Sequence, residues 1–98
     1  MKERKFECGQ LVLTAAVEEC AKENPAFNAF VSVCFLRHMT GDWGDLEPED
    51  AKMNDEALSN DKGRLFSAYI YPPYEEIRIW IITEEDRSVT TILFPSDY

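Results

Sequence analysis

The sequence contains only four glycines and a single histidine, and these shortages exclude several classes of functional site. Gly41, Gly44 and Gly63 do not have the spacing of a phosphate-binding loop or of a dinucleotide fingerprint. No serine lies in a G-x-S-x-G motif, and His38 is the only histidine available as a general base. A serine or cysteine hydrolase is therefore poorly supported. The sequence predicts no cofactor.

The chain also lacks paired cysteines and long apolar runs. Its three cysteines, Cys8, Cys20 and Cys34, form no C-x-x-C pair, which excludes a zinc ribbon and a thioredoxin-type motif. Reduced thiols in a cytoplasmic protein are the expectation. The first ten residues carry charge without the apolar segment of a signal peptide, and no apolar stretch is long enough to span a bilayer. We therefore expect a cytoplasmic protein without a membrane segment.

Basic residues are scarce relative to acidic ones. The chain has 10 Lys and Arg residues against 19 Asp and Glu residues, which gives a net charge of −9. Most of this charge lies in the middle of the chain, because residues 39–62 hold eight acids and only two lysines. A field of this sign repels phosphate backbones, so we expect no direct nucleic-acid binding. A partner protein with a basic surface is the corresponding positive expectation.

The length and the hydrophobic content predict one α+β domain that covers residues 1–98. Residues 6–13 are expected to form a short strand, and residues 14–60 a helical part with three helices. Residues 64–94 hold three strand-like runs joined by short turns, which predicts a three-stranded antiparallel meander packed against the helices.

The helix boundaries carry recognisable signals. Thr14 can cap a helix that ends before Asn24, and Asn24 followed by Pro25 is a strong start signal for the second helix. Gly41 is expected to stop that second helix, whose apolar stripe comprises Phe27, Phe30, Val31, Cys34, Phe35 and His38, widened by Val33 and Leu36. A helix so apolar is expected to be central and largely buried. The third helix is expected from Pro48 to Ser59, with Asp45 or Glu47 near its N-cap and a thinner apolar stripe of Ala51, Met53, Ala57 and Leu58.

The middle strand of the predicted meander, residues 77–83, is apolar on both faces. Such a strand is usually central and covered on both sides, so one face should pack on the helices. The other face should meet the N-terminal segment, a further layer or a second subunit. The last strand, residues 89–94, ends the meander and carries few charges. Homodimerisation through an exposed edge or face of the sheet is therefore a reasonable expectation.

The sharpest local feature is the segment from His38 to Leu46, which places a histidine close to several carboxylates. His38, Asp42, Asp45 and Asp50 have the chemistry of a metal ligand set, although their spacing matches no EF-hand or H-E-x-x-H motif. The alternative interpretation is structural, and we favour it: His38 extends the apolar stripe, while Asp42 and Asp45 cap backbone donors.

Trp43 lies between these acids and also has two interpretations. An exposed tryptophan would be an anchor for a partner, since tryptophan is enriched among interface hot spots. A tryptophan folded back into the core is the more common arrangement and the one that we favour.

A second charged turn, residues 83–88, joins the last two strands and includes Glu84, Asp86 and Arg87. These side chains could bind a partner or a cation, or pair with one another. The favoured structural interpretation is that Arg87 reaches the acidic turn at Asp42, because a guanidinium matches a carboxylate with two hydrogen bonds.

The spacing of several motifs resembles a small family of bacterial proteins found on plasmids, conjugative elements and prophages, some of them labelled plasmid-related proteins. The matching residues are the H-x-x-G-D-W-G-D-L run that begins at His38, then Asn54 and Asp55, S-A-Y from Ser67, and W-I-I-T-E-x-D-R-S-x-T-T-I-L from Trp80. The match covers about residues 38–98. The resemblance implies a setting on mobile DNA and supplies no catalytic residue.

Two functions are compatible with these observations. The first is a non-enzymatic interaction module of a mobile element, in one specific form an acidic DNA mimic that modulates a nucleic-acid enzyme. The alternative is a small metal-dependent hydrolase that uses His38, Asp42 and Asp45. We favour the interaction module, because no catalytic set is recognisable and the middle segment is strongly acidic.

Overall fold

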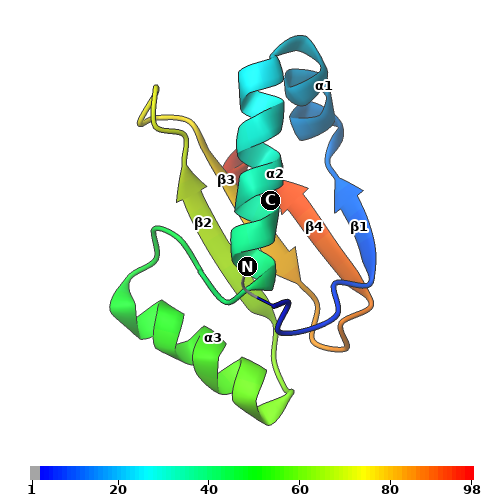
Figure 1. Ribbon diagram of the computed structural model, residues 1–98, viewed down its shortest axis with the longest axis vertical. Helices are drawn as coiled ribbons and strands as arrows, with labels where there is room; N and C mark the ends of the chain where they lie inside the picture. The colour runs from blue at the N-terminus through cyan, green and yellow to red at the C-terminus, as the bar shows by residue number, and fades with distance from the viewer. Residues whose placement is uncertain (1–2) are drawn as a thin grey trace.

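The computed structural model describes residues 3–98, and within them three α-helices lie against one four-stranded sheet (Figure 1). The elements in chain order are β1 (Gln10–Leu13), α1 (Ala15–Glu23), α2 (Pro25–Met39), α3 (Pro48–Asn60), β2 (Leu65–Ile70), β3 (Arg78–Thr83), β4 (Val89–Leu93) and a 3₁₀ turn, η1 (Pro95–Asp97). The expected α+β class is confirmed.

The sheet differs from the predicted three-stranded meander. Strands β2, β3 and β4 pair antiparallel as expected, but β1 adds to β4 in parallel and makes the sheet mixed, with the order β1-β4-β3-β2. The parallel pairing joins Gln10 to Val89 and Leu13 to Ile92. Strand β4 is therefore an inner strand, so the expectation that it forms an exposed edge is wrong.

The first strand is shorter than the predicted span 6–13, and it begins only at Gln10. Gly9 has a φ of +65°, and a Cβ at this position would collide with the carbonyl of Ser88. Only glycine permits this conformation and this close approach without strain. The residues before Gly9 leave the sheet, and the Phe6 ring lies against His38 and Trp43.

The predicted helix starts of α1 and α2 are confirmed. The Thr14 hydroxyl accepts a hydrogen bond from the Val17 amide, and the Asn24 carboxamide oxygen accepts from the amides of Ala26 and Phe27 at 3.1 and 3.2 Å. Helix α3 begins at Pro48 as expected, but Glu47 makes no side-chain cap, and Asp45 bonds elsewhere. Asp61 ends α3 in a left-handed conformation.

Helices α1 and α2 cover one face of the sheet (Figure 1), and the hydrophobic core lies between these helices and the sheet. Four residues of the predicted apolar stripe of α2 are buried as expected: Phe27, Val31, Cys34 and His38. The two residues expected to widen it, Val33 and Leu36, are instead 55 % and 63 % exposed. Both therefore lie on the solvent-facing side of α2.

On α3, the expected apolar stripe is also partly wrong. Met53 is 66 % exposed, whereas Asn54 is the buried residue of this helix. Asn54 is buried because its side chain bonds to the sheet, as described below.

The opposite face of the sheet carries Trp80, which contacts Phe66 and Tyr98. The C-terminal turn η1 lies against β3. Among residues 3–98, no helix combines the length and the apolar character that crossing a bilayer requires.

Candidate functional site

His38 is completely buried beneath the sheet-facing side of α2 and takes part in a chain of polar side chains. One ring nitrogen, Nδ1, contacts the Ser67 hydroxyl, and Nε2 lies 2.9 Å from the Thr83 hydroxyl. Thr83 in turn contacts the Thr90 hydroxyl at 2.8 Å, and Thr90 donates to the carbonyl of Cys8 at 2.7 Å. The chain thus links α2 to β2, β3, β4 and the N-terminal segment.

The surroundings of this chain are aromatic. The Phe6 and Trp43 rings both meet the imidazole edge-on, with centroids 5.4 and 5.6 Å away. Burial away from water lowers the pKa of His38 to about 3, so the imidazole is neutral at physiological pH. Because Ser67, Thr83 and Thr90 are buried too, this Ser–His contact lies in the interior and not in an open cleft.

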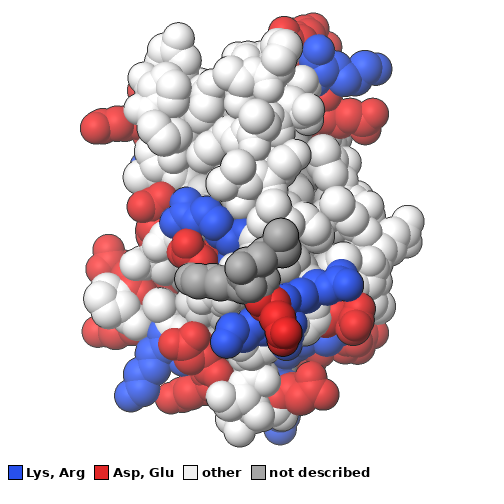
Figure 2. All heavy atoms as spheres, in the orientation of Figure 1, with Lys and Arg blue, Asp and Glu red and all other residues white. Residues whose placement is uncertain are grey.

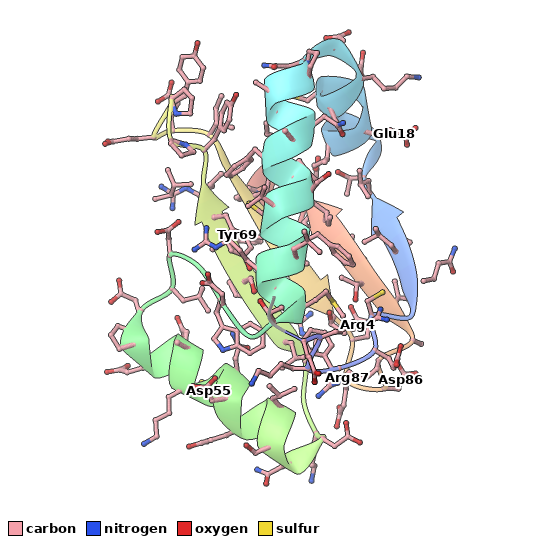
Figure 3. All side chains as sticks on the ribbon, viewed as in Figure 1. Arg4, Glu18, Asp55, Tyr69, Asp86 and Arg87 are labelled. Carbon is pink, nitrogen blue, oxygen red and sulfur yellow. The ribbon has the colours of Figure 1, made fainter. Side chains whose placement is uncertain are left out.

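The turn after α2 is held by Asp42. Its carboxylate accepts two hydrogen bonds from the Arg37 guanidinium, at 2.8 and 3.2 Å, and one from the Gly44 amide. Tyr69, whose ring lies under the guanidinium of Arg37, donates to the Asp42 carbonyl at 2.7 Å (Figure 3). The partner of Asp42 is therefore Arg37, five residues earlier.

The remainder of this turn, Trp43 to Asp45, lies along the outer edge of β2. The Ala68 amide donates to the Trp43 carbonyl, and the Asp45 amide donates to the Ala68 carbonyl, which forms a short parallel bridge. Gly44 is required at its centre, because a Cβ there would collide with the Ala68 carbonyl. The Asp45 carboxylate then accepts from the Ile70 amide at 2.9 Å.

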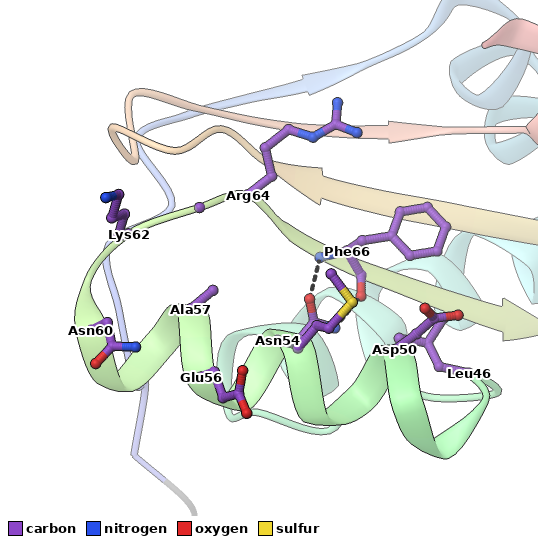
Figure 4. Close-up of a pocket in the computed structure, with 11 residues that line it drawn as sticks. Leu46, Asp50, Asn54, Glu56, Ala57, Asn60, Lys62, Arg64 and Phe66 are labelled. Atoms are coloured by element: carbon purple, nitrogen blue, oxygen red, sulfur yellow. Dashed lines mark hydrogen bonds between the residues drawn. The ribbon is translucent and has the colours of Figure 1, made fainter.

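Asn54 extends this edge protection to Phe66. Its carboxamide oxygen accepts from the Phe66 amide at 3.1 Å, and its amino group donates to the Phe66 carbonyl (Figure 4). The outward backbone groups of β2 at Phe66 and Ala68 and the amide of Ile70 are thus all bonded within the chain. The G-D-W-G-D run and Asn54 act together as a cover for an edge strand.

Trp43 is 5 % exposed, so the interpretation of an exposed anchor is wrong. The indole N–H donates to the Asp55 carboxylate at 2.9 Å, which ties α3 to the turn. Asp55 is thus a structural acceptor on the side of α3 that faces the turn.

Arg87 does not reach the turn at Asp42, so the favoured sequence interpretation is also wrong. Its guanidinium donates to the carbonyls of Gly63 at 2.7 Å, Glu85 at 3.0 Å, Glu84 at 3.2 Å and Ala57 at 3.4 Å, between the β3–β4 turn and α3 (Figure 3). A planar guanidinium with several donors suits this role, because it can bond to several backbone carbonyls at once.

The rest of the β3–β4 turn is closed by its own groups. The Asp86 carboxylate accepts from the amide and the hydroxyl of Ser88, and these bonds lower the pKa of Asp86. The Glu84 amide donates to the Val89 carbonyl and closes the hairpin.

The proposed metal ligands do not converge. His38 bonds to hydroxyls in the interior, Asp42 to Arg37, and Asp45 to the Ile70 amide. Within residues 3–98, no group of three or more His, Cys, Asp or Glu side chains could hold a metal ion. The geometry therefore offers no support for the hydrolase alternative.

An open groove lies between α3 and β2, and we call it the α3–β2 groove (Figure 4). It has a volume of about 640 Å³, and its apolar lining comprises Leu46, Met53, Ala57 and Phe66. Asp50 and Glu56 line its α3 side, and Lys62 and Arg64 its other end. Six acids of the segment from Glu47 to Asp61 are exposed, against the single base Lys52.

Sequence reasoning missed the buried polar residues Ser67 and Thr83, which contact His38, and Thr90, which contacts Thr83. A signal was present, because each of them lies in a strand among apolar residues, where a buried polar residue needs a partner. It also missed Arg37 and Tyr69, whose contacts depend on the folded turn.

Comparison with known proteins adds no assignment, because no family model, no curated protein and no solved structure matches the chain.

Proposed function

We propose that this chain is a small non-enzymatic module of the bacterial cytoplasm that binds another protein through the α3–β2 groove. The observation that supports the proposal most directly is Met53, an apolar side chain two-thirds exposed beside an apolar groove. Exposed apolar surface rimmed by polar residues is typical of protein interaction sites.

The charge around the groove indicates the chemistry of the partner. Glu49, Asp50 and Glu56 surround Met53 on α3, and all three are exposed. A binding segment that presents an apolar side chain flanked by lysine or arginine would be attracted to these acids. These exposed acids beside the groove support the proposal that a basic partner binds at the α3–β2 groove.

The proposal also includes a role in a mobile element and, more specifically, action as a DNA mimic. The resemblance of residues 38–98 to proteins of plasmids and prophages supports a role in a mobile element. In its specific form, the acidic segment 39–62 occupies the basic channel of a nucleic-acid enzyme in place of DNA. The negative charge concentrated on α3 is consistent with this form.

A displayed library of random peptides, selected on the purified chain at low salt, tests the groove. We expect selected peptides to share an apolar residue flanked by basic residues, and to lose binding to Met53→Glu. Val33→Glu is the matched control, because it places the same charge on an exposed position of α2, far along the chain from the groove. Equal binding to both variants would contradict the proposal.

The DNA-mimic form has its own test. The chain is added at low salt to a panel of restriction enzymes, and cleavage of their DNA is followed. Inhibition that weakens with salt and is lost in Glu49→Lys, Glu56→Lys would support the mimic. If no enzyme in the panel is bound or inhibited, the mimic form is abandoned and the peptide selection decides the broader proposal.

A further inference from the structure

Helix α2 has a second apolar face, opposite the one that packs on the sheet. The first twelve residues of α2, Pro25 to Leu36, include no charged side chain, although 30 % of the whole chain is charged. Such a helix is normally buried on all sides. Here Ala26, Ala29, Val33 and Leu36 are all exposed. Figure 2 shows an uncharged surface over the upper middle of the molecule, where α2 lies in Figure 1, with charged side chains at the two sides of it.

The spacing of these four residues favours another helix as their contact. They recur at intervals of three, four and three, which are the a and d positions of a heptad. Residues at this spacing form a single seam along a helix, and the two alanines allow a close approach. We call these four residues the α2 seam.

The sizes of the side chains indicate which helix fits. The two small residues lie in the N-terminal half of the seam and the two large residues in its C-terminal half. If two copies of α2 pack antiparallel, Ala26 faces Leu36 of the second copy, and Ala29 faces Val33 of the second copy. Facing small and large side chains interdigitate, whereas a parallel pair would place the large residues against each other.

We propose that two copies of this chain associate through the α2 seam as an antiparallel helix pair with two-fold symmetry. A two-fold interface uses the same patch on both copies, and the seam is complementary to itself in this orientation. The proposal is independent of the α3–β2 groove, which lies on another helix and stays open in the dimer.

Charge agrees with this arrangement. Two chains of net charge −9 repel each other, so a stable contact requires a surface without acids. The seam provides one, and the acids of α3 lie outside it. The antiparallel orientation also brings Arg37, the only charged residue of α2, near Glu23 of the second copy. Glu23 is exposed at the end of α1.

A further exposed aromatic residue extends the patch beside the seam. Tyr74, in the β2–β3 loop, is 53 % exposed and contacts Tyr71, which packs on Phe30 of α2. With this addition the interface is still small, so we expect a reversible dimer that depends on concentration.

Sedimentation equilibrium of the full chain tests the association. We expect a monomer–dimer equilibrium for the wild type, a monomer for Val33→Glu and for Ala29→Leu, and an unchanged dimer for the control Met53→Glu. Both substitutions in the seam are at exposed positions of a helix, and circular dichroism checks that the variants fold. A wild type that stays monomeric at about 1 mM, where even a Kd of about 1 mM would populate the dimer, overturns the proposal. Undiminished dimerisation of Val33→Glu also overturns it.

Cysteine cross-linking tests the orientation. In a background with Cys8→Ser and Cys20→Ser, and with Cys34 left in its buried place, one preparation carries Ala29→Cys and another Val33→Cys. We expect a mixture of the two to form a disulfide-linked dimer faster than either alone, because residue 29 faces residue 33 of the second copy. Faster cross-linking of Val33→Cys alone would indicate a parallel pair and overturn the antiparallel seam.

The two proposals can be tested separately. If Val33→Glu loses self-association but keeps peptide binding, the result supports the α2 seam and does not involve the α3–β2 groove. If Met53→Glu loses peptide binding but keeps self-association, the result concerns the groove alone.

Discussion

At the scale of single residues, the candidate ligands His38, Asp42 and Asp45 each form hydrogen bonds within the fold. His38 is the clearest case, since both ring nitrogens contact hydroxyls and no part of the ring is exposed. A buried imidazole that stays neutral makes the stability of the fold depend on pH, and this dependence has a predictable sign.

The pKa of His38 is lowered to about 3 in the folded chain, whereas a histidine in the unfolded chain titrates near its ordinary value of 6.5. Between these values the unfolded state binds a proton that the folded state does not, so the stability is complete above pH 6.5 and falls as the pH drops. We expect a loss of about 2 kcal/mol between pH 7 and pH 5, measured by urea unfolding.

The control for this prediction is His38→Gln, which cannot take up the proton. It should be less stable at pH 7, because Ser67 and Thr83 lose a partner, but its stability should change much less between pH 7 and pH 5. An equal pH dependence in both proteins would assign the effect to the carboxylates instead.

Arg87 combines four hydrogen bonds with a strained backbone, because its φ is +62°. Replacement by alanine removes the bonds and keeps the strain, so Arg87→Ala should lose about 2–3 kcal/mol of unfolding free energy. Arg87→Gly removes the bonds but also relieves the strain, so it should be about 1 kcal/mol more stable than Arg87→Ala. Urea unfolding of both variants measures the difference, and a glycine variant no better than alanine would contradict it.

At the scale of the elements, the two edges of the sheet are treated differently. The edge of β2 is covered by the turn at Trp43 to Asp45 and by Asn54, whereas β1 is a short edge of four residues. Covering one edge with the chain's own polar groups prevents pairing with other chains, so the residues of this cover are expected to matter for stability and for solubility.

Asn54→Ala leaves the amide and the carbonyl of Phe66 without their partner and should cost about 2–3 kcal/mol of unfolding free energy. Hydrogen exchange should also show faster exchange of the Phe66 amide, because its hydrogen bond is lost. The matched control is Asn60→Ala on the same helix, an exposed position where we expect a change within about 0.5 kcal/mol. Similar losses of unfolding free energy in both variants would mean that Asn54 affects stability only through the helix and not through its hydrogen bonds to Phe66.

The sequence predicted those elements whose signals are local. The caps at Thr14 and Asn24 lie beside the helices that they start, and short turns separate the three strand-like runs of residues 64–94. The pairing of β1 with β4 joins residues about 80 positions apart and has no local signal. For the same reason the partners of Asp42, Asn54 and Arg87 were not predictable: each side chain is typical of several turn or cap contacts, and the folded chain selects one.

At the scale of the whole molecule, acids outnumber bases nearly two to one, and few of the charges are paired. Among residues 3–98, the ion pairs are Arg37 with Asp42 and, at a longer distance of 3.9 Å, Arg87 with Asp61. Most acidic side chains in this range therefore have no basic partner in an ion pair. Repulsion between these acids opposes the compact state.

Salt should therefore stabilise this protein, because screening weakens repulsion among exposed acids more than it weakens two ion pairs. Between about 10 mM and about 500 mM NaCl, we expect a gain of about 1 kcal/mol, which corresponds to roughly 4–8 °C in Tm for a domain of this size. The matched variant is Glu49→Lys, Glu56→Lys, in which two exposed acids of α3 become bases and the net charge falls from −9 to −5. Its Tm should be higher at low salt and respond less to NaCl. Because a general salting effect would raise the Tm of both proteins equally, an unchanged response in the variant would show that the acidic segment does not limit the stability of the fold.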